Sequence, residues 1–194
     1  MCADCSRSAF PALVAEQVDR RLAHMNRIAI VAVVAPLLAT TVLGCKPKLY
    51  KAGSSSMSPT ITNGDFVVAD LSAFSRSAPA RWDVVVFHPP VAASGGVSLT
   101  QVWVMRVVGL PGETVSCATG GITVNGQPLS PPARLTNINY KALDKLRWSA
   151  GVTSPFVVPS ASYFVLGDNS TNANDSRYWG ALPRSNILER VLKK

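Results

Sequence analysis

Serine hydroxyls gather at one point of this 194-residue chain, where four serines fall within the eight residues 53–60. A serine hydroxyl can attack a carbonyl carbon, but it is a weak nucleophile until a neighbouring base takes its proton. By composition alone the run would be a polar linker. Met57 and the Pro59-Thr60 pair give it a definite shape instead. The run is therefore a candidate nucleophile segment that needs a base from elsewhere in the chain.

The sequence contains no complete set of metal ligands. Cys2 and Cys5 form one Cys-x-x-Cys pair, but neither a second pair nor a histidine cluster completes a zinc or redox site. We interpret the pair as part of a frayed N-terminal tail, and we expect no metal ion and no cofactor. Cys45 and Cys117 are as compatible with free thiols as with a disulfide.

Four segments of the chain resemble the sequence boxes of the bacterial type I signal peptidases. Residues 54–60 (SSSMSPT) resemble their Ser-x-Ser-Met-x-Pro-Thr box, and residues 81–87 (RWDVVVF) resemble their Arg-Gly-Asp-hydrophobic strand. Residues 106–113 (RVVGLPGE) match their Arg-hydrophobic-Gly-Leu-Pro-Gly-Asp/Glu box, and residues 167–180 resemble their Gly-Asp-Asn…Asp-Ser-Arg-x-Trp-Gly box. The segments occur in the family's order, and with the apolar run before them they cover residues 28–180.

The resemblance implies a membrane-bound serine endopeptidase that uses a Ser–Lys pair and removes signal peptides from exported preproteins after small residues, as in Ala-x-Ala. Ser56, directly before methionine, takes the position of the nucleophile. Ser54 takes the position whose hydroxyl, with the Ser56 backbone N–H, stabilises the tetrahedral oxyanion. Asp175 and Arg177 match the box that pairs charges and braces the site from behind.

The position of the family's lysine base is Met105 in this sequence, directly before Arg106. A methionine thioether takes no proton from a hydroxyl, although its unbranched stem can fill the same slot. A second departure is Ala173, at the position where family members often carry a serine that hydrogen-bonds the lysine ammonium. Arg106 and Asp168 keep to the family's boxes and are expected to support the site. The base and its orienting partner are therefore both missing.

Three interpretations of the missing lysine remain open. In the first, another side chain supplies the base. The candidates are His88, because histidine is the residue type best suited to base catalysis near neutral pH, and Lys46, Lys48, Lys51, Lys141 and Lys145. In the second, the protein is a weak peptidase whose rate rests on oxyanion stabilisation and substrate binding. In the third, it is a non-catalytic relative that binds preproteins or signal peptides at the membrane.

The chain after Lys46 has the pattern of β-structure. Short runs rich in β-branched and aromatic residues alternate with turn residues, at 66–68, 84–87, 102–108, 114–115, 122–124, 156–158 and 163–166. Asn63-Gly64, Pro111-Gly112 and Asn125-Gly126 mark turns, and Pro89-Pro90 ends the second run because proline cannot donate to a β-ladder. We predict a mostly β, signal-peptidase-like domain at 46–194, with a loop-rich insertion at 127–155 that contains a short helix at 140–148.

Peptide binding to this domain would have a defined form. The resemblance implies that an extended peptide adds to an exposed strand edge, with small pockets for the first and third residues before the cleavage site. The apolar runs 66–68 and 84–87 are the expected walls of these pockets.

An uncharged run of 18 residues, from Ile28 to Cys45, precedes the predicted domain. As a helix it would span roughly 27 Å, close to the ~30 Å of a bilayer core, so we predict one transmembrane anchor at 28–45 and a cytoplasmic tail at 1–27. A buried core helix and a lipoprotein signal from Met25 to a lipidated Cys45 are the alternatives. The flanking charges are nearly balanced, so the resemblance alone places residues 46–194 on the outer face of the cytoplasmic membrane.

The net charge of +8 bears on the partners of the protein. Fifteen basic and eight acidic residues lie at 46–194, and such a basic domain beside a bilayer is drawn to anionic lipid headgroups. No basic stripe interleaved with aromatic residues is present, so we expect no nucleic-acid partner. The expected partners are membrane lipids and preprotein substrates.

Overall fold

The structure, a computed structural model, describes residues 46–75, 77–94, 101–118, 121–135, 137–138, 140–141 and 155–194. The predicted tail, the predicted anchor at 28–45 with Cys45, and Lys145 lie outside these residues. Across the described part of the chain, no helix is both long and apolar enough to cross a membrane. Lys46–Lys194 forms one compact unit.

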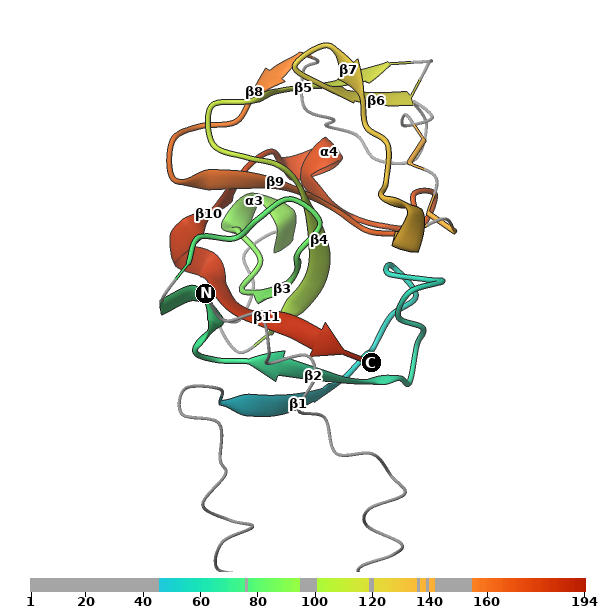
Figure 1. Cartoon of the computed structure of the whole chain (residues 1–194), viewed down its shortest axis with the longest axis vertical. Helices are drawn as coiled ribbons and strands as arrows, with labels where there is room; N and C mark the ends of the chain where they lie inside the picture. Colours follow the sequence, from blue (N-terminus) through green and yellow to red (C-terminus); the bar gives the residue numbers. More distant parts are fainter. Residues whose placement is uncertain are drawn as a thin grey trace, which may run out of the picture. The chain divides into compact units, whose positions relative to one another are not determined.

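Seven strands of the described residues form the larger sheet (Figure 1). In chain order they are β1 (Pro47–Lys51), β2 (Phe66–Asp70), β3 (Val84–Phe87), β4 (Trp103–Gly109), β9 (Ser162–Leu166), β10 (Leu182–Pro183) and β11 (Ile187–Lys193). Their order across the sheet is β1-β2-β11-β3-β4-β9-β10, and each neighbouring pair is antiparallel. The C-terminal strand therefore lies between β2 and β3, and β1 forms one edge.

A smaller sheet is built from the chain between β4 and β9. It contains β5 (Thr114–Ala118), β6 (Gly121–Val124), β7 (Gln127–Pro128) and β8 (Phe156–Val157), in the order β7-β6-β5-β8. Asn125 and Gly126 join β6 to β7 with φ angles of 51° and 78°. Two successive positive φ angles are the geometry of a tight hairpin turn, and Asn-Gly is the sequence that adopts it most readily.

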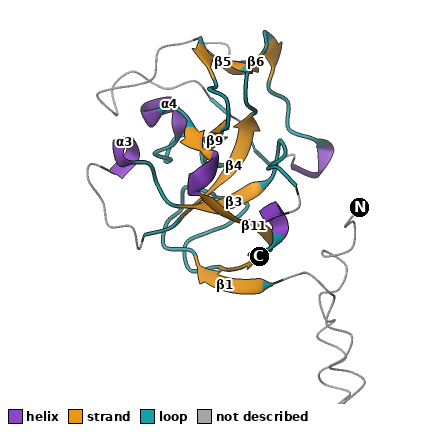
Figure 2. Cartoon of the chain, turned by 90° about the vertical axis from the view of Figure 1, so that its left-hand side faces the viewer, coloured by secondary structure: helices purple, strands orange, loops and turns teal. Residues whose placement is uncertain are grey.

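The helices of the described residues are short. Two are α-helical, α3 (Val91–Ser94) and α4 (Ser176–Trp179), and three are single 3₁₀ turns, η1 (Ala73–Ser75), η2 (Ala133–Leu135) and η3 (Arg184–Asn186). Figure 2 shows α3 and α4 as neighbours on one side of the larger sheet. The Asp175 carboxylate caps α4 by accepting a hydrogen bond from the backbone N–H of Arg177.

The prediction of a mostly β fold is confirmed. All seven predicted runs lie in or overlap strands, and β3 ends at Phe87, directly before His88 and the two prolines. The strands β1 and β11 were not predicted, because their sequences PKLYK and ILERVLK interrupt the apolar residues with charges. Of the predicted helix at 140–148, Tyr140 and Lys141 lie outside any helix and the other residues lie outside the described part of the chain.

Buried side chains form two clusters, and one of them holds the serine segment. Met57 from that segment and Ile61 just after it pack with Val67 of β2, Val85 of β3 and Met105 of β4. The second cluster lies under the smaller sheet and is formed by residues such as Val115, Ile122 and Phe164. The first cluster thus fixes the serine segment against the strand that carries position 105.

Candidate active site

A pocket of about 410 Å³ lies between the serine segment and the start of β4. Its walls come from residues 50–54 and 56–57, from residues 101–105, and from Ile61, Val67 and Asn174. Val67 belongs to one of the two predicted walls. The other predicted wall, β3, contributes no lining residue among the described residues, because β4 and the two residues before it occupy that side.

The two predicted active-site serines lie side by side on this pocket. The Oγ atoms of Ser54 and Ser56 are 3.0 Å apart, and the backbone N–H of Ser56 lies 3.5 Å from the Ser54 Oγ. Ser54 is exposed and Ser56 is half-buried, so both hydroxyls are open to a bound ligand. Two hydroxyls and one backbone N–H therefore converge, and such a group can supply both a nucleophile and donors to an oxyanion.

The loop that follows β9 holds the serine segment from behind. The backbone N–H of Asn169 donates to the Ser56 carbonyl at 2.9 Å, and the Asn169 side-chain amide donates to the Ser55 carbonyl at 3.1 Å. A Cβ atom added at Gly167 would lie 2.6 Å from the Ser56 carbonyl oxygen and 2.4 Å from the Ala173 Cβ atom. Only glycine allows this approach, so the Gly-Asp-Asn sequence sets where Ser56 lies.

Met105 lines the same pocket as Ser54 and Ser56. It is 3% exposed, pairs with Val85 across the β3–β4 ladder, and belongs to the core cluster that includes Met57. Its thioether offers a weak acceptor and no basic nitrogen. The side of the pocket that position 105 forms is therefore apolar.

Arg106, the next residue, points to the opposite face of β4 and forms a buried ion pair. Its Nε and Nη2 atoms donate to the two carboxylate oxygens of Asp168 at 2.9 and 2.6 Å, and the Tyr140 hydroxyl donates to the same carboxylate at 2.8 Å. Burial alone lowers the pKa of Arg106, but the Asp168 carboxylate outweighs it and raises that pKa above its usual value. Burial likewise raises the pKa of Tyr140. The pair joins β4 to the loop after β9.

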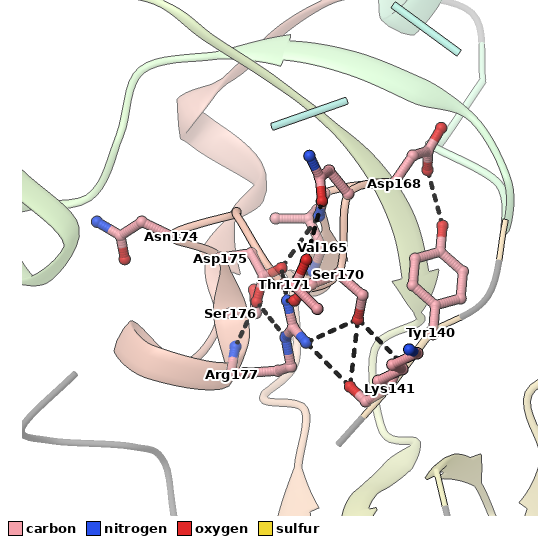
Figure 3. Close-up of polar contacts among 12 residues, drawn as sticks. Tyr140, Lys141, Val165, Asp168, Ser170, Thr171, Asn174, Asp175, Ser176 and Arg177 are labelled. Carbon is pink, nitrogen blue, oxygen red and sulfur yellow. Dashed lines mark hydrogen bonds and ion pairs between the residues drawn. The ribbon is translucent and has the colours of Figure 1, made fainter. Parts of the chain in front are cut away.

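Asp175 and Arg177 form a second ion pair with fully buried side chains. Arg177 donates from Nε and Nη2 to Asp175 at 2.8 and 2.7 Å, and its Nη1 and Nη2 atoms reach Ser170 and the Lys141 carbonyl (Figure 3). The Asp175 carboxylate also accepts a hydrogen bond from the backbone N–H of Gly167 at 3.1 Å. Burial raises the pKa of the Asp175 carboxyl, and its hydrogen bonds and ion pair with Arg177 act in the opposite direction. This network fixes the Gly167 backbone against Ser56.

The side chains considered as substitute bases differ in their positions. Lys51 lines the pocket and is the one charged residue among the described residues that do so. The Lys48 ammonium lies 3.4 Å from the Glu189 carboxylate, and its contacts with Tyr50 and Glu189 raise its pKa, which disfavours the neutral base. His88 lies outside the pocket lining, and its ring Nδ1 is 3.2 Å from the carbonyl oxygen of Gln101.

Sequence reasoning missed several residues of the pocket wall. Tyr50 and Ala52 belong to the unpredicted strand β1 and its continuation, and Gln101 precedes the part of β4 that pairs with β3. Asn174 directly follows Ala173 inside the Gly-Asp-Asn…Asp-Ser-Arg box. Its position in that box was the one available signal.

Comparisons with known proteins show the family to which the chain belongs. The sequence profile of the family described as "Signal peptidase, peptidase S26" matches residues 22–193. A signal peptidase I from Leptolyngbya laminosa is 38% identical over 141 residues, which are 72% of this chain and 64% of that protein. A probable signal peptidase I-1 from Synechocystis sp. is 37% identical over 140 residues, 72% of this chain and 66% of that protein.

The chain thus spans slightly less than two thirds of the length of these two relatives. A solved signal peptidase I from Enterococcus faecalis is 27% identical, with a TM-score of 0.41 and coverage of 59% of this chain and 97% of that one. The profile match extends over most of the chain and includes all four boxes. The chain belongs to the signal peptidase family, peptidase S26.

Proposed function

We propose that this chain is a membrane-bound serine endopeptidase of the signal peptidase I type, which cleaves signal peptides from preproteins slowly because position 105 lacks a base. Ser56 is the nucleophile, and Ser54 with the Ser56 N–H stabilises the oxyanion. The observation that carries this proposal is the 3.0 Å contact between the Ser54 and Ser56 hydroxyls on an apolar pocket that Met105 also lines. Family membership supports the same reaction.

The reaction at this site is an acyl transfer. The Ser56 Oγ attacks the scissile carbonyl carbon, the hydroxyl proton leaves to water or to a pocket side chain, and the peptide nitrogen takes a proton as it departs. Water then hydrolyses the acyl-enzyme and frees Ser56. Loss of general-base assistance typically slows such a reaction by about 10²–10⁴-fold, whereas the oxyanion donors and peptide binding continue to contribute.

The proposed location is the membrane surface, with residues 46–194 on the outer side. Large exposed apolar side chains on the solvent-facing surface of the β1–β2 pair support this membrane location. Leu49 is 61% exposed and Phe66 is 56% exposed, on strands that pair directly. Lys51 pairs with Phe66 in the same ladder, so apolar and cationic groups alternate there as anionic bilayer surfaces favour.

A non-catalytic role in binding preproteins or signal peptides is the second candidate function. Met105 favours it, because its buried thioether leaves an apolar pocket that can hold a ligand but provides no base for cleavage. The two functions predict different responses to a lysine at position 105.

The test is Met105→Lys in the full-length chain, assayed with a preprotein that carries Ala-x-Ala before its cleavage site. A lysine buried as Met105 is would lose hydration, so its pKa would fall from about 10.4 toward the range of a general base. We expect cleavage to rise about 10²–10⁴-fold, and to vanish when Ser56→Ala is added. Adding Ala173→Ser should raise the rate further by giving the ammonium a hydrogen bond.

The matched control is Val104→Lys, which adds the same charge to the same pocket one residue away. It should not raise cleavage. Robust cleavage by the natural chain that Met105→Lys diminishes would mean that another base already serves Ser56. If the natural chain and Met105→Lys are both inert but both bind the preprotein, the binding role replaces the peptidase.

A further inference from the structure

Two residues of the pocket wall, Gln101 and Val102, lie just beyond the end of the β3–β4 ladder. The last paired residues of the ladder are Phe87 and Trp103, and the chain continues beyond Phe87 into His88 and two prolines. A proline has no backbone N–H, so β3 cannot extend past this point as a regular strand. Gln101 and Val102 nevertheless line the pocket.

The backbone of His88 is already engaged by Asn186 in η3. The His88 N–H donates to the Asn186 carbonyl at 3.0 Å, and the Asn186 side-chain amide donates to the His88 carbonyl at 3.0 Å. Both backbone groups of His88 thus turn away from β4. The His88 ring, and not its backbone, contacts the residues that precede β4: its Nδ1 lies 3.2 Å from the Gln101 carbonyl oxygen.

The direction of this hydrogen bond follows from the chemistry of the partner. A carbonyl oxygen only accepts, so His88 Nδ1 must carry the proton and donate it. The ring therefore replaces the backbone donor that a longer β3 would have supplied to Gln101. The segment that follows His88 and includes α3 is also bonded to a pocket residue, because the Asn174 side-chain amide donates to the Ala93 carbonyl at 3.2 Å.

We propose that His88 is a positioning residue that fixes the Gln101–Val102 wall for peptide binding, and that it is not the missing base. The proposal rests on the function proposed above. An extended peptide would bind by forming backbone hydrogen bonds with the Gln101–Val102 wall. A wall that is already held in place loses less conformational entropy when the peptide binds. Removal of one such hydrogen bond should weaken peptide binding by about 3–10-fold.

The experiment compares His88→Ala with His88→Asn in the full-length chain that also carries Ser56→Ala, so that no peptide is consumed. The Asn side-chain amide nitrogen can take the place of Nδ1, but an amide cannot act as a base. Val91→Ala is the matched control, because Val91 lies on the same segment and is 77% exposed. The probe is a synthetic peptide that spans a signal-peptide cleavage site, with alanine at the first and third positions before it.

We expect His88→Ala to weaken binding about 3–10-fold and to speed amide hydrogen exchange at residues 102–104, while His88→Asn and Val91→Ala behave like the parent. The exchange measurement needs no ligand. If the parent binds no peptide, the proposed function fails, and exchange alone decides whether His88 holds this wall. Unchanged exchange in His88→Ala, or equal defects in His88→Asn and His88→Ala, would overturn the proposal. With Ser56 restored, loss of cleavage in His88→Asn without loss of binding would identify His88 as the base and also overturn it.

Discussion

The buried pair beside position 105 allows a quantitative test of how the site is supported. Asp168→Asn keeps the size of the side chain but removes its charge. Arg106 now donates to both carboxylate oxygens and Tyr140 donates to one of them, with the Arg106 and Asp168 side chains 4% and 0% exposed. An asparagine has one acceptor oxygen, so at least one guanidinium N–H loses its acceptor, and the new NH₂ group faces other donors.

The expected cost is about 3–5 kcal/mol of unfolding free energy, because the guanidinium charge stays buried without its counter-charge. Urea denaturation of the full-length chain, followed by tryptophan fluorescence, measures it. Lys194→Gln is the control, since its ion pair with Asp65 is solvent-exposed at 46% and 25% and such pairs contribute little. Equal, small effects of the two substitutions would refute the reasoning that this pair is desolvated and holds β4 to the Gly-Asp-Asn loop.

Two further substitutions test other parts of the frame. Gly167→Ala should cost about 1–3 kcal/mol in urea denaturation, because the new Cβ would lie 2.6 Å from the Ser56 carbonyl oxygen, whereas Gly53→Ala meets no atom within 4 Å and should be neutral. Asp65→Asn should lower the melting temperature at neutral pH. Hydrogen bonds from Thr62 depress the Asp65 pKa from 3.8 to about 2, so its stabilising contribution is present above pH 3.8 and is lost as pH falls through about 2. The melting temperatures of the two proteins should therefore converge at the acidic end, and a constant difference would contradict this assignment.

The sequence predicts strands well where the apolar side chains are continuous. Val84–Phe87 is such a run, and three of its four residues are buried in the middle of the sheet. The strand β1 escaped prediction because four of its five residues are exposed, so its sequence lacks the alternation that a buried face produces. Its strand structure comes from pairing with β2, which is a tertiary contact that local sequence does not encode.

Within the site, the motifs predict which residues lie close together, but they do not predict the backbone conformation at each position. Trp82 takes the place of glycine in the family's Arg-Gly-Asp strand, and its φ of 76° is in the region that favours glycine. Its ring stacks on Tyr140 with centroids 6.4 Å apart, and its carbonyl accepts a hydrogen bond from Arg106 at 3.0 Å. The position therefore combines a glycine-like backbone with a bulky side chain, which the family's motif does not predict.

The polar contacts that hold the Ser56 backbone do not involve position 105. Asn169 and Gly167 hold the Ser56 backbone, and the Asp175 ion pair holds Gly167, without any contact that a lysine would have to make. Met105, by contrast, is 3% exposed within an apolar cluster, where an ammonium would lose most of its hydration. A lysine buried there would cost folding free energy, and under the proposed function it would also supply a base, so stability and activity would conflict at this position. Met105 packs in this cluster, and the Ser54–Ser56 hydroxyl pair and the pocket lie beside it.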